Sequence, residues 1–325
     1  MEKKYAIYAL LSCLLLSLGI KTNAQYDAQL SNYWAALSYY NPAYVGQSGN
    51  LELMGLNRQQ WVGIEGAPKS LIITGDMPIK FLGRTHGVGA SMFSENIGLF
   101  THSIISGQYA YQKKLWKGNL SLGIKLGMIK ESFRGTGVNL GEEVENNEGE
   151  GETIGTDEGM PNTDLDGSGI DLGIGIYYTR GKWYAGFSSQ HLNQASVEIG
   201  DKHNFDLTRS YYLVGGYNMI LNNPLLELQP SAFMKQAAGT MQAELSLRMI
   251  YNKLFWGGLS YRYKDSGILM LGGQYKSICA GYAYDFPMSD IGKESFGSHE
   301  LFVKYVMEID LDKRKKSKHK SIRML

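Results

Sequence analysis

The chain has 325 residues, of which 43% are hydrophobic and 19% charged, with 40 glycines, 22 tyrosines and a formal net charge of +1. This composition excludes a disordered chain, and the nearly balanced charge gives no general attraction to nucleic acid. After residue 24, no apolar run reaches the about 18 residues that a membrane-spanning helix needs. These properties leave open whether the chain folds in water or in a bilayer.

The first 24 residues have the features of a secretory signal peptide. Two lysines precede the uncharged apolar stretch 6–20, and Ala24 supplies the small residue that signal peptidase accepts. We therefore expect cleavage after Ala24. A lipoprotein signal at Cys13 is the alternative, but Leu14 and the two leucines after it continue the apolar core beyond that cysteine. Cleavage would leave Cys279 as the single thiol, so we expect no internal disulfide.

Apolar and polar residues alternate along most of the remaining chain, which is the pattern of a two-faced β-strand. In the stretch 120–128, leucine, isoleucine and methionine take the even positions, whereas serine, glycine and lysine take the odd ones. About fourteen stretches share this pattern and have about the 9–11 residues of a membrane-crossing strand. They lie near residues 51–60, 70–77, 86–95, 101–113, 118–132, 168–179, 182–191, 208–219, 225–236, 240–251, 254–264, 266–275, 277–286 and 298–310. Since the first stretch is apolar on both faces, we expect a bulge at Gly55.

The connections between these stretches favour a barrel in the outer membrane. If the first strand runs upward from the periplasm, the tight turns fall on the periplasmic side, and 133–167, 192–207 and 287–297 form long outer segments. Aromatic residues recur near strand ends, as interfacial girdles require, and the inferred inner face is rich in glycine. We therefore predict an all-β fold, a transmembrane antiparallel up-and-down β-barrel of about fourteen strands spanning 51–310. A soluble all-β domain with inverted faces is the alternative.

Two motif-rich stretches carry a family resemblance. Residues 25–46 read QYDAQLSNYWAALSYYNPAYVG and residues 58–70 read RQQWVGIEGAPKS. With YAYQKKL at 109–115 and GNLSLGIKLG at 118–127, they resemble the PorP/SprF family of type IX secretion outer-membrane proteins. Its most specific residues here are Asn41, Pro42, Ala43, Tyr44, Gly46, Arg58, Gln60, Trp61, Gly66 and Pro68. The chain departs from the family at Leu30, where an aromatic residue is expected, and in an acidic insertion after residue 141.

The resemblance implies a non-catalytic barrel that serves protein export or display, with outer-membrane lipid around it and no nucleic-acid partner. PorP-like members contact a periplasmic lipoprotein ring and a peptidoglycan-binding lipoprotein, whereas SprF-like members are paired with a large secreted surface adhesin. The residues do not distinguish these two roles. A channel for small or hydrophobic solutes is the alternative function, because fourteen strands can enclose a usable lumen.

The segment 25–50 is too short to be a domain, and we expect a periplasmic segment or a lumenal plug. We hypothesise that its aromatic part, 25–45, lies against the glycine-lined wall and closes the pore. Asn41-Pro42 has the residues of a turn, which either starts the first strand or is simple punctuation. Trp61 is expected to be a girdle residue or a contact for the exported partner.

Two charged segments flank or interrupt the predicted barrel. Ten acidic residues and no basic ones lie between residues 142 and 166, within an expected extracellular loop at 133–167. Asp164 and Asp166 resemble the start of a calcium loop, but Gly173 stands where that loop needs a glutamate; a solvated run is the plainer reading. No other cofactor is expected.

The expected periplasmic tail, 311–325, is basic and binds an acidic partner or the cell wall, or only adds solubility. Its cations are Lys313, Arg314, Lys315, Lys316, Lys318, Lys320 and Arg323.

The sequence contains no pattern typical of an enzyme. The six histidines are scattered, and neither a metal-binding helix nor a nucleophile elbow occurs. Ser298, His299 and Glu300 have the residue types for acyl transfer, but neighbours on a strand point to opposite faces. Four charged residues are instead expected to face the lumen and form ion pairs: Lys125, Glu244, Arg248 and Arg262.

Overall fold

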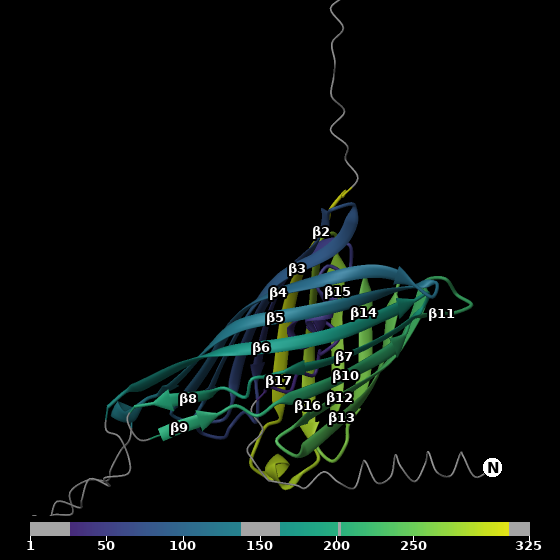
Figure 1. Ribbon diagram of the computed structural model, residues 1–325. Helices are drawn as coiled ribbons and strands as arrows, with labels where there is room; N and C mark the ends of the chain where they lie inside the picture. The colour runs from purple at the N-terminus through teal and green to yellow at the C-terminus, as the bar shows by residue number, and fades with distance from the viewer. Residues whose placement is uncertain (1–26, 138–162, 201–202, 312–325) are drawn as a thin grey trace, which may run out of the picture.

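The computed structural model describes residues 27–137, 163–200 and 203–311. Within them, fourteen strands form one closed antiparallel barrel, which confirms the predicted fold (Figure 1). Their bounds are β1 Asn50–Gln59, β2 Lys69–Phe81, β3 Arg84–Ile97, β4 Phe100–Leu115, β5 Gly118–Phe133, β6 Leu165–Arg180, β7 Trp183–Gln190, β10 Ser210–Tyr217, β12 Leu226–Ala237, β13 Thr240–Tyr251, β14 Phe255–Arg262, β15 Ser266–Tyr275, β16 Ile278–Pro287 and β17 Ser298–Glu308. The barrel closes where β1 pairs with β17.

The outer wall is apolar and the inner wall polar, as the alternation predicts. In β5, Leu122, Ile124 and Leu126 are between 50% and 62% exposed, whereas Ser121 and Lys125 are buried in the interior. Apolar rows of this extent need acyl chains around them, so the soluble alternative is wrong. Among the described residues, no helix has the length and apolar character needed to cross a membrane.

Connections at the two ends of the barrel differ in length. At one end, which we call the short-turn end, β4 and β5 are joined only by Trp116 and Lys117, both with positive φ as a tight hairpin turn requires. At the other, the long-loop end, the segments 60–68, 191–209 and 288–297 connect strands. The expectation that the short-turn end faces the periplasm stays a prediction.

Some small elements were not expected from the sequence. A short hairpin, β8 Ser196–Ile199 and β9 His203–Asp206, forms in the expected outer segment 192–207, and β11 Met219–Ile220 adds to β12. Four-residue and two-residue strands are too short to show the period-two pattern. The remaining elements are α2 Leu37–Tyr40, η1 Pro42–Tyr44, η2 Gly135–Gly137 and η3 Asp290–Lys293.

The predicted bulge at Gly55 is wrong. Gly55 pairs in unbroken register with Ile73 of β2 and Val303 of β17. Both faces of β1 are apolar for another reason. Leu53 points outward and is 48% exposed, whereas the inward Met54 packs in a buried cluster with residues of the N-terminal segment.

Candidate functional site: the N-terminal segment inside the barrel

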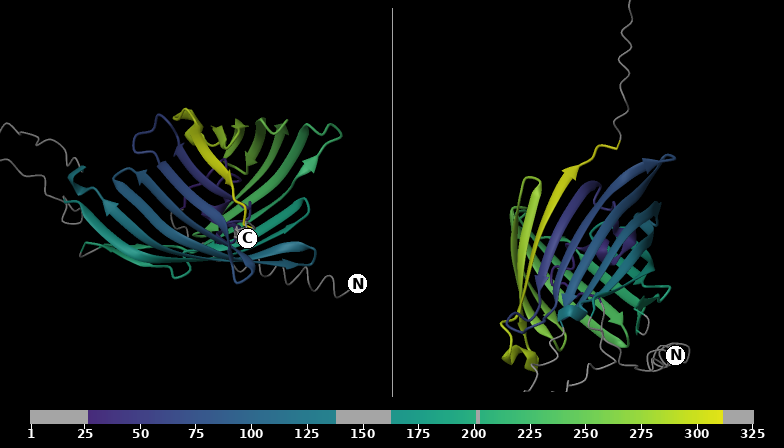
Figure 2. Two further views of the ribbon diagram at one scale, coloured as in Figure 1. Left: turned by 90° about the horizontal axis from the view of Figure 1, so that it is seen from above. Right: turned by 90° about the vertical axis from the view of Figure 1, so that its left-hand side faces the viewer.

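Residues 27–49, which we call the plug, lie inside the ring of strands (Figure 2). Nearly every plug residue up to Val45 is buried. The plug starts beside His191 at the long-loop end and reaches β1 at the short-turn end, so it runs along the lumen. Its aromatic rings pack on the wall. Tyr33, for example, stacks on Phe233 with ring centroids 4.8 Å apart.

A patch of glycines receives the motif Asn41–Gly46. A Cβ added at Gly123 would lie 2.6 Å from the Cα of Ala43, and one at Gly89 would lie 2.9 Å from the Val45 side chain. Such distances are closer than real Cβ atoms adopt, so only glycine lets the plug backbone approach the wall. The glycine patch comprises residues on β3 and, beyond β4, on the adjacent strands β5, β6 and β7: Gly87, Gly89, Gly123, Gly175 and Gly186.

Asn41 joins the motif to the wall by hydrogen bonds. Its Oδ1 accepts the N–H of Ala43 at 2.9 Å, which caps the short helix η1, and its Nδ2 donates to the carbonyls of Ile176 and Phe187 at 3.0 and 3.3 Å. Pro42 opens η1, where no backbone N–H is needed. The turn therefore lies in the lumen and not at the start of the first strand, because β1 begins only at Asn50.

Gly46 ends the motif with a left-handed backbone. Its φ is +70°, and its N–H donates to the Asp76 carboxylate at 2.8 Å. An added Cβ would stand 2.8 Å from the Cα of Gly87. Tyr44 meets the wall through Tyr177, with edge-on rings 5.3 Å apart. Each motif residue therefore has a packing or hydrogen-bonding reason for its identity.

A buried group of charges, the Arg58 cluster, connects the two motif stretches. It comprises Ser31 and Asn32 of the plug with the wall residues Arg58, Glu244, Arg262, Asp285 and Glu300. Arg58 pairs with Asp285 at 2.8 Å and Glu300 at 3.3 Å, and donates to the Ser31 hydroxyl at 2.9 Å. The backbone N–H groups of Ser31 and Asn32 donate to the Glu300 carboxylate at 2.8 and 2.6 Å. Buried charges are tolerated only when paired in this way.

A second buried group, the Asp27 cluster, binds the start of the plug. His191 lies 3.0 Å from Asp27 and 2.9 Å from Asp171 of β6. The Tyr212 hydroxyl donates to the Asp27 carboxylate, and Lys235 donates to its carbonyl. Burial alone would raise the pKa of Asp27, but the charges of His191 and Lys235 outweigh it and hold that pKa well below its usual range. Asp27 is therefore a charged anchor of the plug.

The other motif residues lie in the loop 60–68 at the long-loop end, away from the glycine patch. The Gln60 N–H donates to the carbonyl of Pro68 at 3.0 Å, which closes the loop. Trp61 has a φ of +49°, and its N–H donates to a serine hydroxyl at the start of β17. Gly66 has a φ of +71° and accepts the N–H of Gly98. Whether Trp61 is a girdle residue or a partner contact stays a prediction.

The expected calcium ligands already have protein partners. Asp164 accepts the backbone N–H and hydroxyl of Thr136 at 3.2 and 2.9 Å, and Asp166 pairs with Lys130 at 2.9 Å. In the described part of the chain, no three acidic, histidine or cysteine side chains come together as metal ligands do. Calcium binding stays a prediction. The expected signal peptide 1–24, most of the acidic loop and the basic tail from 313 lie outside the described residues.

Of the four predicted lumenal charges, three lie near an opposite charge. Glu244 and Arg262 pair at 3.0 Å, and Lys125 lies 4.0 Å from Asp171. Within the described residues, Arg248 does not form the predicted ion pair; its guanidinium stacks on the ring of Trp34. Alternation also separates the acyl-transfer residue types: Ser298 and Glu300 are buried on the lumenal face, and His299 between them is on the other face, bonded to the Tyr282 hydroxyl.

Sequence reasoning missed several plug contacts. Asp27, Ser31 and Glu300 stand in no motif that marks them as partners. The glycines on the inner face were the sequence feature that could have indicated where the plug packs, because a row of small residues with no other explanation indicates the close approach of another backbone.

Comparison with known proteins identifies the family of the chain. A family model described as "Type IX secretion system membrane protein PorP/SprF" matches residues 22–305. None of the curated protein sequences matches the chain. Similar solved structures include the Ralstonia pickettii toluene transporter TbuX (13% identity, 89% of this chain and 96% of that chain covered, TM-score 0.47) and a Pseudomonas aeruginosa FadL homologue (10%, 80% and 89%, 0.42). Likenesses at this level support no inference about function.

Proposed function

Because this chain belongs to the PorP/SprF family and is an outer-membrane component of the type IX secretion system, we propose that it works as a sealed, non-enzymatic barrel. In this role it anchors periplasmic machinery or receives an exported surface protein such as an adhesin. The family match supports the secretion role, and the filled lumen supports the sealed state.

The observation that carries the proposal is the plug itself. Aromatic rings occupy the middle of the lumen, and ion-paired clusters tie the plug to the wall towards the long-loop end. Pulling the plug out would leave the carboxylates of Asp285 and Glu300 with fewer donors and expose the rings to water. A barrel closed in this way is suited to binding partners at its ends. The alternative role, a channel for small or hydrophobic solutes, requires the plug to leave.

Mass spectrometry of what co-purifies with the mildly detergent-extracted protein tests the proposal. We expect secretion-system lipoproteins or the terminus of an adhesin, and little solute uptake when the purified barrel is placed in liposomes. Rapid uptake without any co-purified partner would favour the channel instead.

Removing residues 25–45 tests the sealing separately. Conductance in planar bilayers should rise, because the wall keeps its own strand pairing and loses only what fills it. The intact chain, purified in parallel, is the control. Equal conductance of the two proteins would show that the plug does not close the pore.

A further inference from the structure

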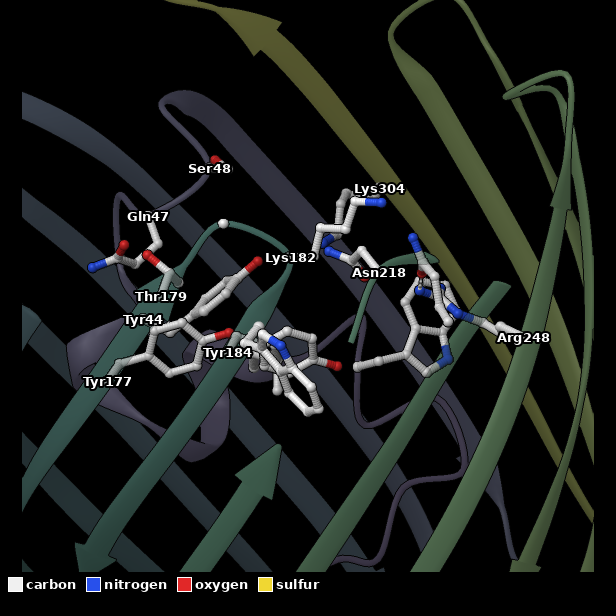
Figure 3. A pocket seen from close by; sticks show the side chains of 15 residues that line it. Tyr44, Gln47, Ser48, Tyr177, Thr179, Lys182, Tyr184, Asn218, Arg248 and Lys304 are labelled. Carbon is white, nitrogen blue, oxygen red and sulfur yellow. Dashed lines mark hydrogen bonds between the residues drawn. The ribbon is translucent and has the colours of Figure 1, made fainter. Parts of the chain in front are cut away.

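At the short-turn end, the lumen beyond the plug is open and forms a cavity of about 360 Å³, which we call the vestibule (Figure 3). Its floor includes Trp34 and Tyr44 of the plug, and its walls include Tyr177, Tyr184, Arg248 and Lys304. Figure 3 shows the tyrosines on one side of the cavity and Arg248 on the other. The vestibule therefore has an aromatic side and a cationic side.

The charge of the vestibule is one-sided. The described residues of its lining include the cations Lys182, Arg248 and Lys304 and no carboxylate. Lys304 is neutralised by Glu52 at 3.1 Å. Arg248 has no acidic partner within ion-pair distance among the described residues, unlike Arg58 and Arg262. Because a half-buried cation without an acid leaves its potential unopposed, the cavity attracts an anion.

Arg248 is held in place and keeps donors free. Its guanidinium carbon lies 3.3 Å from the ring centroid of Trp34, and one of its N–H groups donates to the Gln229 side chain. Gly258, opposite Arg248 on β14, leaves room for the side chain, since a Cβ there would lie 2.8 Å from the Arg248 Cγ. A guanidinium has five N–H donors, so most remain for a ligand.

Two lining residues also carry donors without partners. The indole Nε1 of Trp34 and the amide Nε2 of Gln47 have no hydrogen-bond partner in the described chain. Both atoms are buried behind the cavity surface, so the group of the vestibule that is open to a ligand is the Arg248 cation. Its charge and its donors call for a negatively charged acceptor.

We propose that the vestibule binds a carboxylate carried on an apolar or aromatic body. The carboxylate accepts from the planar fork of Arg248, which matches its two oxygens. The body lies along the rings of Tyr44, Tyr177 and Tyr184. The ring centroid of Tyr177 lies 5.3 Å from that of Tyr44 and 6.2 Å from that of Tyr184. The C-terminus of a polypeptide and a free aromatic acid both present this chemistry. The inference does not depend on the secretion role, because it is measured on the isolated barrel.

The test is calorimetric titration of the full-length protein in detergent with N-acetyl-leucyl-phenylalanine, its C-terminal amide, and phenylacetate. We expect the acid to bind at least about tenfold more tightly than the amide, the difference expected of a charge-assisted hydrogen bond. Arg248→Gln should abolish that preference. Lys253→Gln, an exposed turn lysine at the same end, should keep it.

The two acids in the titration distinguish the two possible sources of the carboxylate. If the peptide acid binds and phenylacetate does not, the ligand is a polypeptide terminus. If both acids bind equally well, the ligand is a small acid. In the unmodified protein, equal affinity for the peptide acid and its amide, or no binding of either acid, would overturn the proposal. This outcome does not depend on whether a variant folds. Heat-modified gel mobility verifies that Arg248→Gln is folded.

Discussion

Substitution of Gly123 by alanine tests whether the glycine patch holds the plug. The new Cβ would stand 2.2 Å from the backbone nitrogen of Ala43, whereas ordinary contacts begin at 3.4 Å, so the plug must retreat by about 3.4 − 2.2 = 1.2 Å. The wall cannot yield instead, because β5 is hydrogen-bonded to β4 and β6. Overpacking of this kind costs about 1–3 kcal/mol. The strand preference of alanine over glycine does not change the docking free energy, because β5 stays paired whether the plug is docked or not.

We therefore expect Gly123→Ala to weaken plug docking by about 1–3 kcal/mol, which raises the undocked fraction by about five- to 150-fold. Brief openings in planar bilayers and a lower urea midpoint in micelles should report it. Gly107→Ala is the matched control on β4, where an added Cβ has nothing within 4 Å and should be neutral or stabilising. If both variants seal and unfold alike, the close approach of plug and wall does not contribute to docking.

Three further predictions address the charged groups. Arg58→Met should lower the free energy of unfolding by about 3–5 kcal/mol, because it removes the cation paired with the buried Glu300 carboxylate, whereas loss of the exposed Lys130–Asp166 pair should have a much smaller effect. Urea titration in micelles compares them, and equal effects would contradict the role of burial. Truncation after Asp312 should leave folding intact and weaken co-purification of periplasmic partners, and unchanged pull-downs in dilute salt would refute a binding tail. If Asp164 and Asp166 hold calcium, calorimetric titration should give heat that their double alanine variant lacks, and two identical flat traces would exclude the site.

Much of the wall was predictable because lipid imposes a simple rule on it. Outward residues contact acyl chains and inward ones do not. Apolar and polar residues therefore alternate along each strand, and this pattern can be recognised in one strand without knowing which strands lie beside it. The expected stretch 240–251 coincides with β13, and 118–132 falls within β5. The expected second strand ended near residue 77, yet β2 continues through Pro78 to Phe81. Local pattern thus predicted strand number and facing, but not every end.

The amino-acid pattern therefore predicts an outer-membrane barrel of about fourteen strands with an unusual, glycine-lined interior. Which residues bind in that interior, and through which contacts, follows from the folded arrangement. Alternation says that Glu300 and Gly123 point inward, but not which part of the lumen each one faces, because that depends on how the ring closes. Closure brings Arg58 on β1 beside Glu300 on β17 and sets the plug against both, with Ser31 touching Arg58 from within. Contacts between residues hundreds of positions apart leave no local period, so the anchors of the plug and the vestibule could be seen only in three dimensions.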